Sequence, residues 1–103
     1  MAYGFVMDVP APIEFYDALH AEIARLTAGG AVEGLLVHVG RATRDGFQVT
    51  EIWTSKEQCD RFNQEVVGPA LARLSGGQPP PEQPPMQEFE PRGLIVPAAH
   101  VVV

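Results

Sequence analysis

A histidine and a glutamate on two neighbouring predicted strands are the residues best suited to proton-transfer chemistry. The stretch "GLLVHVGRATRDGFQVTEIWTS" (34–55) predicts two apolar strands joined by the turn residues "TRDG". If the turn centres on Arg44-Asp45, His38 lies opposite Glu51. Neutral imidazole titrates near physiological pH, so His38 could accept a proton from an acidic phenol or an activated C–H group. Glu51 could orient the ring and stabilise its protonated form. We expect His38 and Glu51 to be the catalytic pair.

The same two residues also admit a structural interpretation. Polar side chains inside a sheet or a dimer interface are usually hydrogen-bonded to each other and do nothing more. The sequence alone leaves open whether His38 faces a pocket or an interface between subunits.

Three aromatic residues are candidates for binding a substrate. Trp53, the only tryptophan, ends the second strand of the hairpin and offers a flat ring for stacking, although it could equally pack in the core. Tyr16 and His20 are one helical turn apart, so they share one side of the first predicted helix. They could reach a cavity between helix and sheet, or lie half-exposed at the helix edge.

No metal or cofactor is expected. The three histidines, at 20, 38 and 100, show no ligand spacing, and the single cysteine, Cys59, is most simply a small core residue. Neither a glycine-rich phosphate-binding loop nor a Ser-His-Asp pattern is present. NAD, flavin and nucleotide chemistry therefore have no motif to support them.

The charge balance argues against two classes of partner. The chain carries 13 acidic and 7 basic residues, a formal charge of −6, and the basic residues are scattered. A nucleic acid or an anionic membrane surface would be repelled by this field. The apolar runs are too short to span a bilayer, and the N-terminus lacks the pattern of a secretory signal. Together with the lone cysteine, this predicts a cytoplasmic protein.

The remaining sequence predicts one domain over residues 1–103, with elements in the order β-α-β-β-α-β. Pro12 suits a helix start and Gly29-Gly30 a helix end, whereas Gly68-Pro69 should kink the second helix. The expected elements are a strand over 3–9, a helix over 12–28, the hairpin, a helix from Ser55 to Leu74, a proline-rich loop over 75–85, a strand over 86–96 broken at Pro91, and a tail over 97–103.

This order describes an α+β ferredoxin-like fold, an antiparallel sheet with both helices on one face. In the hairpin, Leu36 should lie opposite Trp53, on the face that also holds His38. The other face, with Leu35, Val37, Val39, Thr50 and Ile52, is also mostly apolar. One face is explained by the helices, and the other needs a partner, so we predict a homodimer packed sheet to sheet. The valine-rich tail should pair as an extra strand or lie across the partner.

The stretch from Gly34 to Leu71 resembles the small dimeric α+β barrel proteins related to the antibiotic biosynthesis monooxygenases. Its pattern, H-V-…-D-G-…-W-x-S-x-E…F…P-A-L, is most similar to that of an actinobacterial branch whose members are largely of unknown function. The resemblance covers roughly residues 3–96. It implies the dimeric barrel fold and places the oxygenases' tryptophan at Trp53. Their asparagine four residues earlier is Val49 here, and the histidine ligand of haem-degrading relatives has no counterpart near Phe62, which disfavours anthrone oxygenation and haem degradation.

These observations combine into one leading hypothesis and one alternative. The leading hypothesis is a cofactor-independent enzyme of secondary metabolism, resembling a monooxygenase, cyclase or isomerase, that acts on a small aromatic or polyketide-like molecule held between helices and sheet. The alternative is a non-catalytic homodimeric protein that binds a small ligand or serves as an accessory.

Overall fold

The computed structural model describes residues 2–77, 83–99 and 101–102. Its elements, in chain order, are β1 (Tyr3–Val9), α1 (Ile13–Leu26), β2 (Leu35–Ala42), β3 (Phe47–Trp53), α2 (Lys56–Phe62), the π-helix η1 (Asn63–Val67), α3 (Gly68–Leu74), β4 (Met86–Phe89), β5 (Ile95–Val96), the 3-10 helix η2 (Pro97–Ala99) and β6 (Val101–Val102). Residues 78–82 of the predicted proline-rich loop lie outside the described residues.

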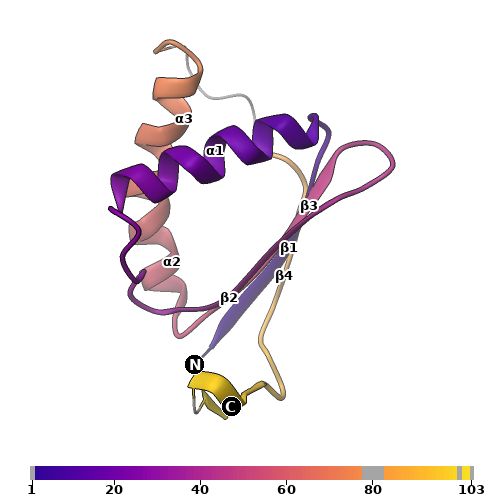
Figure 1. Cartoon of the computed structure of the whole chain (residues 1–103). Helices are drawn as coiled ribbons and strands as arrows, with labels where there is room; N and C mark the ends of the chain where they lie inside the picture. Colours follow the sequence, from indigo (N-terminus) through magenta and orange to yellow (C-terminus); the bar gives the residue numbers. More distant parts are fainter. Residues whose placement is uncertain (1, 78–82, 100, 103) are drawn as a thin grey trace.

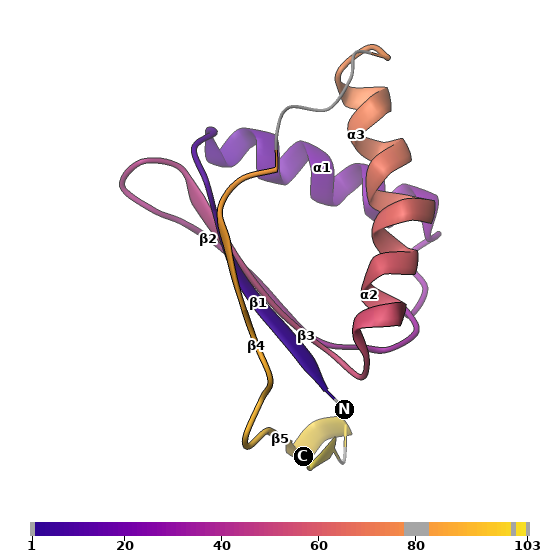
Figure 2. The ribbon, with the colours of Figure 1, turned by 180° about the vertical axis from the view of Figure 1, so that it is seen from behind.

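The main sheet has four strands in the order β2-β3-β1-β4, and every neighbouring pair is antiparallel. Helix α1 and the α2–η1–α3 segment lie on the same side of this sheet (Figure 1). The view from behind, in which the sheet is also seen nearly edge-on, places these helices on that one side again (Figure 2). The predicted β-α-β-β-α-β order and ferredoxin-like architecture are therefore confirmed.

The core lies between the sheet and the helices and is centred on β3. Alternate residues of β3 are buried because side chains point to opposite faces along a strand, and one of the buried residues is the acidic Glu51. The buried hydrophobic cluster consists of Phe5, Phe47, Val49, Trp53 and Cys59. Burial of Cys59 agrees with its prediction as a core residue.

The predicted hairpin register is correct except at its open end. His38 pairs with Glu51, and Gly40 pairs with Val49, as expected from the turn position. A β-bulge between Leu35 and Val37 shifts the register, so that Leu35, not Leu36, lies opposite Trp53. Leu35 thus packs against the core, whereas the sequence placed it on the other face.

The last residue of the "TRDG" turn, Gly46, must be a glycine because the backbone next to it leaves no room for a side chain. An added Cβ at Gly46 would lie 2.0 Å from the Val9 carbonyl oxygen, so the chain can pass this backbone only without a side chain. A positive φ is not the reason for this glycine, because the positive-φ glycines of the described residues are Gly29, Gly34, Gly76 and Gly77. The turn is closed by a 2.8 Å hydrogen bond that the Thr43 N–H donates to the Gly46 carbonyl.

The second helical segment begins as predicted, and a π-helical turn stands where a kink was expected. The Gln58 N–H donates to the Ser55 hydroxyl, which caps the helix. The π-helix, Asn63–Val67, ends two positions before Pro69, and the Gly68 N–H donates to the Asn63 carbonyl. Because proline lacks an N–H and crowds the preceding turn, the wider π turn lets the helix continue through it.

The face of the sheet away from the helices has an apolar area beside a polar row, in which Arg41 and Asp8 are hydrogen-bonded to Gln48. Val37 and Ile52 are half-buried partners on this face, and Val39 is 49% exposed. The ring of Phe89 covers Gly4, where an added Cβ would lie 2.5 Å from it. We call Val37, Val39, Ile52 and Phe89 the outer patch.

The C-terminal residues form a small hairpin of their own. The predicted strand over 86–96 is divided into β4 and β5, and β5 pairs with β6 in a separate two-stranded sheet. In Figure 1 this hairpin lies beyond the end of the main sheet, near the N-terminus. Among the described residues, no helix is long and apolar enough to cross a membrane.

Candidate functional site

A continuous chain of hydrogen bonds joins helix α1 to the core. His38 Nδ1 lies 2.7 Å from one carboxylate oxygen of Glu51, and Trp53 Nε1–H donates to the other over 2.9 Å. On the far side of the histidine, the Tyr16 hydroxyl lies 2.7 Å from His38 Nε2. We call Tyr16, His38, Glu51 and Trp53 the polar chain.

The partners of Glu51 fix the tautomer of His38. An ionised carboxylate only accepts hydrogen bonds, so His38 Nδ1 must carry a proton and donate it. In the neutral ring Nε2 is then the acceptor, and the Tyr16 O–H donates to it. This arrangement places a basic nitrogen at the helix-facing end of the polar chain, with a phenol as its immediate proton donor.

Strand pairing and one glycine position these groups. His38 and Glu51 meet because they are direct cross-strand partners on the face beneath the helices. Tyr16 reaches His38 across Gly40, which follows on the same face of β2, and an added Cβ at Gly40 would lie 2.2 Å from the tyrosine ring. The contact between Tyr16 and His38 was not predicted from the sequence, although a glycine two positions after the histidine was a signal for a ring lying over the strand.

His20 lies at the rim of this site. Its ring centroid is 5.7 Å from that of Tyr16 and 6.0 Å from that of His38, and the residue is exposed. The predicted grouping of Tyr16 and His20 on one side of the helix is therefore seen, and His38 joins it. The three rings form an accessible cluster between α1 and β2.

Trp53 occupies a different environment from the stacking surface that the sequence suggested. Its side chain is fully buried, and its ring centroid is 5.5 Å from that of Phe62. Its indole N–H donates a hydrogen bond to Glu51. In this structure its contribution to the site is to hold one oxygen of Glu51. A direct contact between Trp53 and a ligand stays a prediction.

Burial and charge favour the neutral form of the Tyr16 phenol. Partial burial raises the pKa of Tyr16, and the negative charge of Glu51 adds to this effect. The side chain of His38 is 28% exposed, so the base is open to solvent or to a ligand. Burial also raises the pKa of Cys59 to about 11, which argues against a nucleophilic thiolate.

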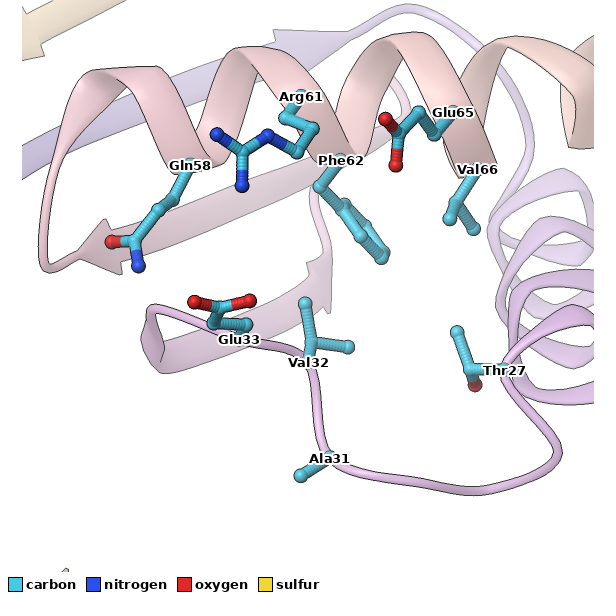
Figure 3. Close-up of a pocket in the computed structure, with 9 residues that line it drawn as sticks. All are labelled: Thr27, Ala31, Val32, Glu33, Gln58, Arg61, Phe62, Glu65 and Val66. Carbon is cyan, nitrogen blue, oxygen red and sulfur yellow. The ribbon is translucent and has the colours of Figure 1, made fainter.

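Two open pockets lie outside the polar chain. The first, about 200 Å³, lies between the α1–β2 connection and the α2–η1 segment (Figure 3). The second, about 370 Å³, is formed by residues 10–13 and 42–46. Neither is lined by His38 or Trp53. No group of three or more metal-ligating side chains occurs in the described ranges.

Comparisons with known proteins identify the fold. No protein-family model and no curated protein sequence matches the chain. A structure named for antibiotic biosynthesis monooxygenases, from Chloroflexus aurantiacus J-10-fl, matches with a TM-score of 0.63 at 24% identity, over 93% of this chain and 98% of its own. Rv0793 from Mycobacterium tuberculosis gives 0.58 at 16% identity, over 88% and 95%.

A third solved structure is that of SnoaB, a cofactor-independent oxygenase from Streptomyces nogalater. It matches with a TM-score of 0.51 at 20% identity, over 93% of this chain and 94% of its own. The chain therefore has the fold of the antibiotic biosynthesis monooxygenase proteins over most of its length. At these identities the likeness concerns the fold, and function must be argued from the site.

Proposed function

We propose that this protein is a cofactor-independent enzyme that removes a proton from a small, acidic aromatic or polyketide-like molecule. The observation that carries the proposal is the pair of 2.7 Å contacts on either side of the His38 ring, to Tyr16 and to Glu51. A base that is oriented by a carboxylate and in contact with a phenol is equipped to move protons. A fold shared with a cofactor-independent oxygenase supports the same class of chemistry.

Each member of the polar chain receives a role. Tyr16 contacts the substrate and passes its proton to His38 Nε2, taking up the substrate's proton in exchange. Glu51 keeps His38 oriented and stabilises the imidazolium that forms, and Trp53 holds the second oxygen of Glu51. His20, at the rim, contributes to binding the aromatic ring.

The substrate anion formed in this step can follow several paths. It can rearrange, cyclise or react with O₂. Oxygenation of a methylene needs no cofactor, because the CH₂ group supplies the electrons that convert O₂ into one carbonyl oxygen and one water. The three outcomes share the first proton transfer, which is the step assigned to the polar chain.

The enzyme is proposed to act as a homodimer in the cytoplasm. The outer patch supports sheet-to-sheet packing because an open apolar face of this kind is normally covered by a partner. The single cysteine is consistent with a reducing compartment.

A non-catalytic ligand-binding or accessory protein is the second candidate. It is favoured by the complete burial of Trp53 and by the position of both pockets away from His38. Under this alternative the polar chain only satisfies buried polar groups and fixes α1 on the sheet.

Replacement of His38 by glutamine separates the two candidates. The probe is a hydroxyanthrone, whose methylene protons are acidic. Val49 counts against oxygenation of an anthrone, so the measurement excludes O₂ and follows only the proton-transfer step, as deuterium uptake at this carbon. We expect His38→Gln to lower the enzyme-dependent rate by about 10²–10⁴ while the melting curve stays near that of the parent, since glutamine can keep one hydrogen bond. Glu51→Gln should cause a smaller loss and shift the pH–rate midpoint.

The opposite results support the alternative. A parent protein that gives no exchange above buffer, or a His38→Gln variant with full activity, would remove the catalytic assignment. A variant that loses about 1–3 kcal/mol of stability, with exchange falling only as the folded fraction falls, would make His38 a structural residue.

A further inference from the structure

The pocket of Figure 3 combines an apolar floor with unpaired charges at its rim. The floor is formed by Val32 and, on the facing helical segment, by Phe62 and Val66, all half-buried. The rim carries one arginine, Arg61, and two carboxylates, Glu33 and Glu65. We call this site the junction pocket.

Arg61 lacks the pairing that its neighbours show. On the same helix Lys56 pairs with Asp60 one turn away, and on α1 Arg25 pairs with Glu22. Arg61 has a glutamate one turn away on either side, Glu57 and Glu65, yet no described residue forms an ion pair or hydrogen bond with it. Its guanidinium instead extends over the pocket (Figure 3).

The two carboxylates are also without a partner among the described residues. Glu65 extends from the π-helical turn and Glu33 from the segment before β2, so the two approach the pocket from opposite walls (Figure 3). π-Helical turns displace side chains from the regular helical positions and are frequent at functional sites. Here the turn contributes Glu65 and Val66 to the pocket wall.

We infer that the junction pocket binds a small zwitterion with an apolar side chain, of the chemical class of a free α-amino acid. A carboxylate of the ligand pairs with Arg61, whose planar fork suits this group, and an ammonium pairs with Glu33 and Glu65. The apolar side chain lies among Val32, Phe62 and Val66. A simple anion would face two uncompensated carboxylates, and a simple cation would face Arg61, so a zwitterion complements the rim best.

The volume of the site agrees with this class. The pocket holds about 200 Å³, and an apolar cavity of about 150 Å³ accommodates benzene. One amino acid with a branched or aromatic side chain fits in such a space. The assignment does not depend on the proposed function, because His38 and Tyr16 are not part of the pocket.

Trp53 provides a reporter for binding. The chain has one tryptophan, so its indole N–H gives a single, self-assigned NMR signal. Phe62 lines the pocket, and its ring centroid is 5.5 Å from that of Trp53. We expect L-leucine, added to the full-length ¹⁵N-labelled protein, to shift this signal saturably together with the backbone amides of residues 58–66.

Matched probes and variants test each charge. Leucinamide lacks the carboxylate and N-acetyl-leucine lacks the ammonium, and each should bind at least about tenfold more weakly than leucine.

The variant Arg61→Gln should weaken the binding of leucine by a similar factor. It should leave the binding of leucinamide unchanged, because leucinamide has no carboxylate for Arg61 to pair with. Arg61 is exposed, so the melting temperature should not change. Arg92→Gln, at another exposed arginine, is the matched control and should bind leucine like the parent.

Three results would overturn the inference. The first is the absence of a saturable shift up to the solubility limit of leucine. The second is equal binding of leucine and leucinamide, which would leave Arg61 without a role. The third is tighter binding of the uncharged ring compound p-cresol than of leucine, which would make the pocket an apolar site.

Discussion

The two faces of the β2–β3 hairpin differ in how their side chains are satisfied. The face beneath the helices contains the His38–Glu51 pair, and every side-chain polar atom of that pair has a partner within the same subunit. The opposite face carries Val37, which is half-buried, and Val39, which is 49% exposed. The polar groups of the inner face therefore find their partners within one chain, whereas the outer face presents exposed apolar side chains.

This difference explains why one hairpin has two apolar faces. A strand that is covered on one side only shows alternation of apolar and polar residues, but β2 and β3 depart from it. The departure on the inner side is the polar chain, which lies where an apolar side chain would otherwise be expected. The departure on the outer side is the outer patch. We expect the polar chain to carry the function of the protein and the outer patch to mediate its assembly.

The largest effect is predicted for a charge on the outer face. Val39→Asp would place an unpaired carboxylate in each half of a sheet-to-sheet interface, so we expect the dimer dissociation constant to rise at least about 100-fold. Val39 is half exposed in the single chain, so the fold should survive. Sedimentation equilibrium measures the change in the dissociation constant.

Leu74→Asp, on helix α3, is the control for this experiment and should not affect assembly. A parent that is monomeric at micromolar concentration would contradict the dimer.

A smaller effect is predicted at the helix-facing end of the polar chain. Tyr16→Phe keeps the ring over Gly40 but removes the hydroxyl that contacts His38, so proton exchange into the hydroxyanthrone should slow by about 10–100-fold. His20→Gln is the matched change, because His20 touches the cluster through ring contacts alone. It should raise KM and leave kcat unchanged. Equal kcat losses in both variants would indicate that the cluster acts only through packing.

The smallest effect is a shift in tyrosine ionisation. The chain has two tyrosines, and burial raises the pKa of both, helped by Glu88 at Tyr3 and by the charge of Glu51 at Tyr16. Unfolded tyrosines ionise near pH 10, so the stability that these neutral phenols contribute is complete below that pH and is lost as the pH rises through the higher folded values. Absorbance titration should show no phenolate transition near pH 10 in the folded protein. Glu51→Gln should lower the pKa of Tyr16 alone, and a normal midpoint in the parent would contradict the buried assignment.

The fold could be predicted well from the sequence, because the patterns that define each strand, turn and helix lie within short stretches of the chain. Alternation, turn residues and the Ser55 cap define the strands, the hairpin and the second helix, and the turn position alone pairs His38 with Glu51. The bulge at Leu36 was missed because one inserted residue leaves the apolar pattern almost unchanged. The π-helical turn before Pro69 was missed for a similar reason, since helical periodicity does not distinguish it from a kink.

The site was predicted only in part because it depends on contacts between distant elements. The contact between Tyr16 and His38 requires α1 to settle at one height above β2, which depends on packing and on the missing side chain of Gly40. The junction pocket likewise joins the α1–β2 connection and the α2–η1 segment, which are far apart in the sequence. Residue types could be chosen from the sequence, but their partners could not.

The tautomer of His38 tests the central claim most directly. The polar chain requires a proton on Nδ1, donated to Glu51, and a free electron pair on Nε2 that receives the Tyr16 O–H. Long-range ¹H–¹⁵N correlation of the His38 ring at a pH where it is neutral distinguishes the two nitrogens, with Tyr16→Phe confirming the partner of Nε2. We predict that Nδ1 carries the proton and that the Nε2 resonance moves in the variant. A proton on Nε2, or an Nε2 signal unaffected by removal of the Tyr16 hydroxyl, would contradict the account.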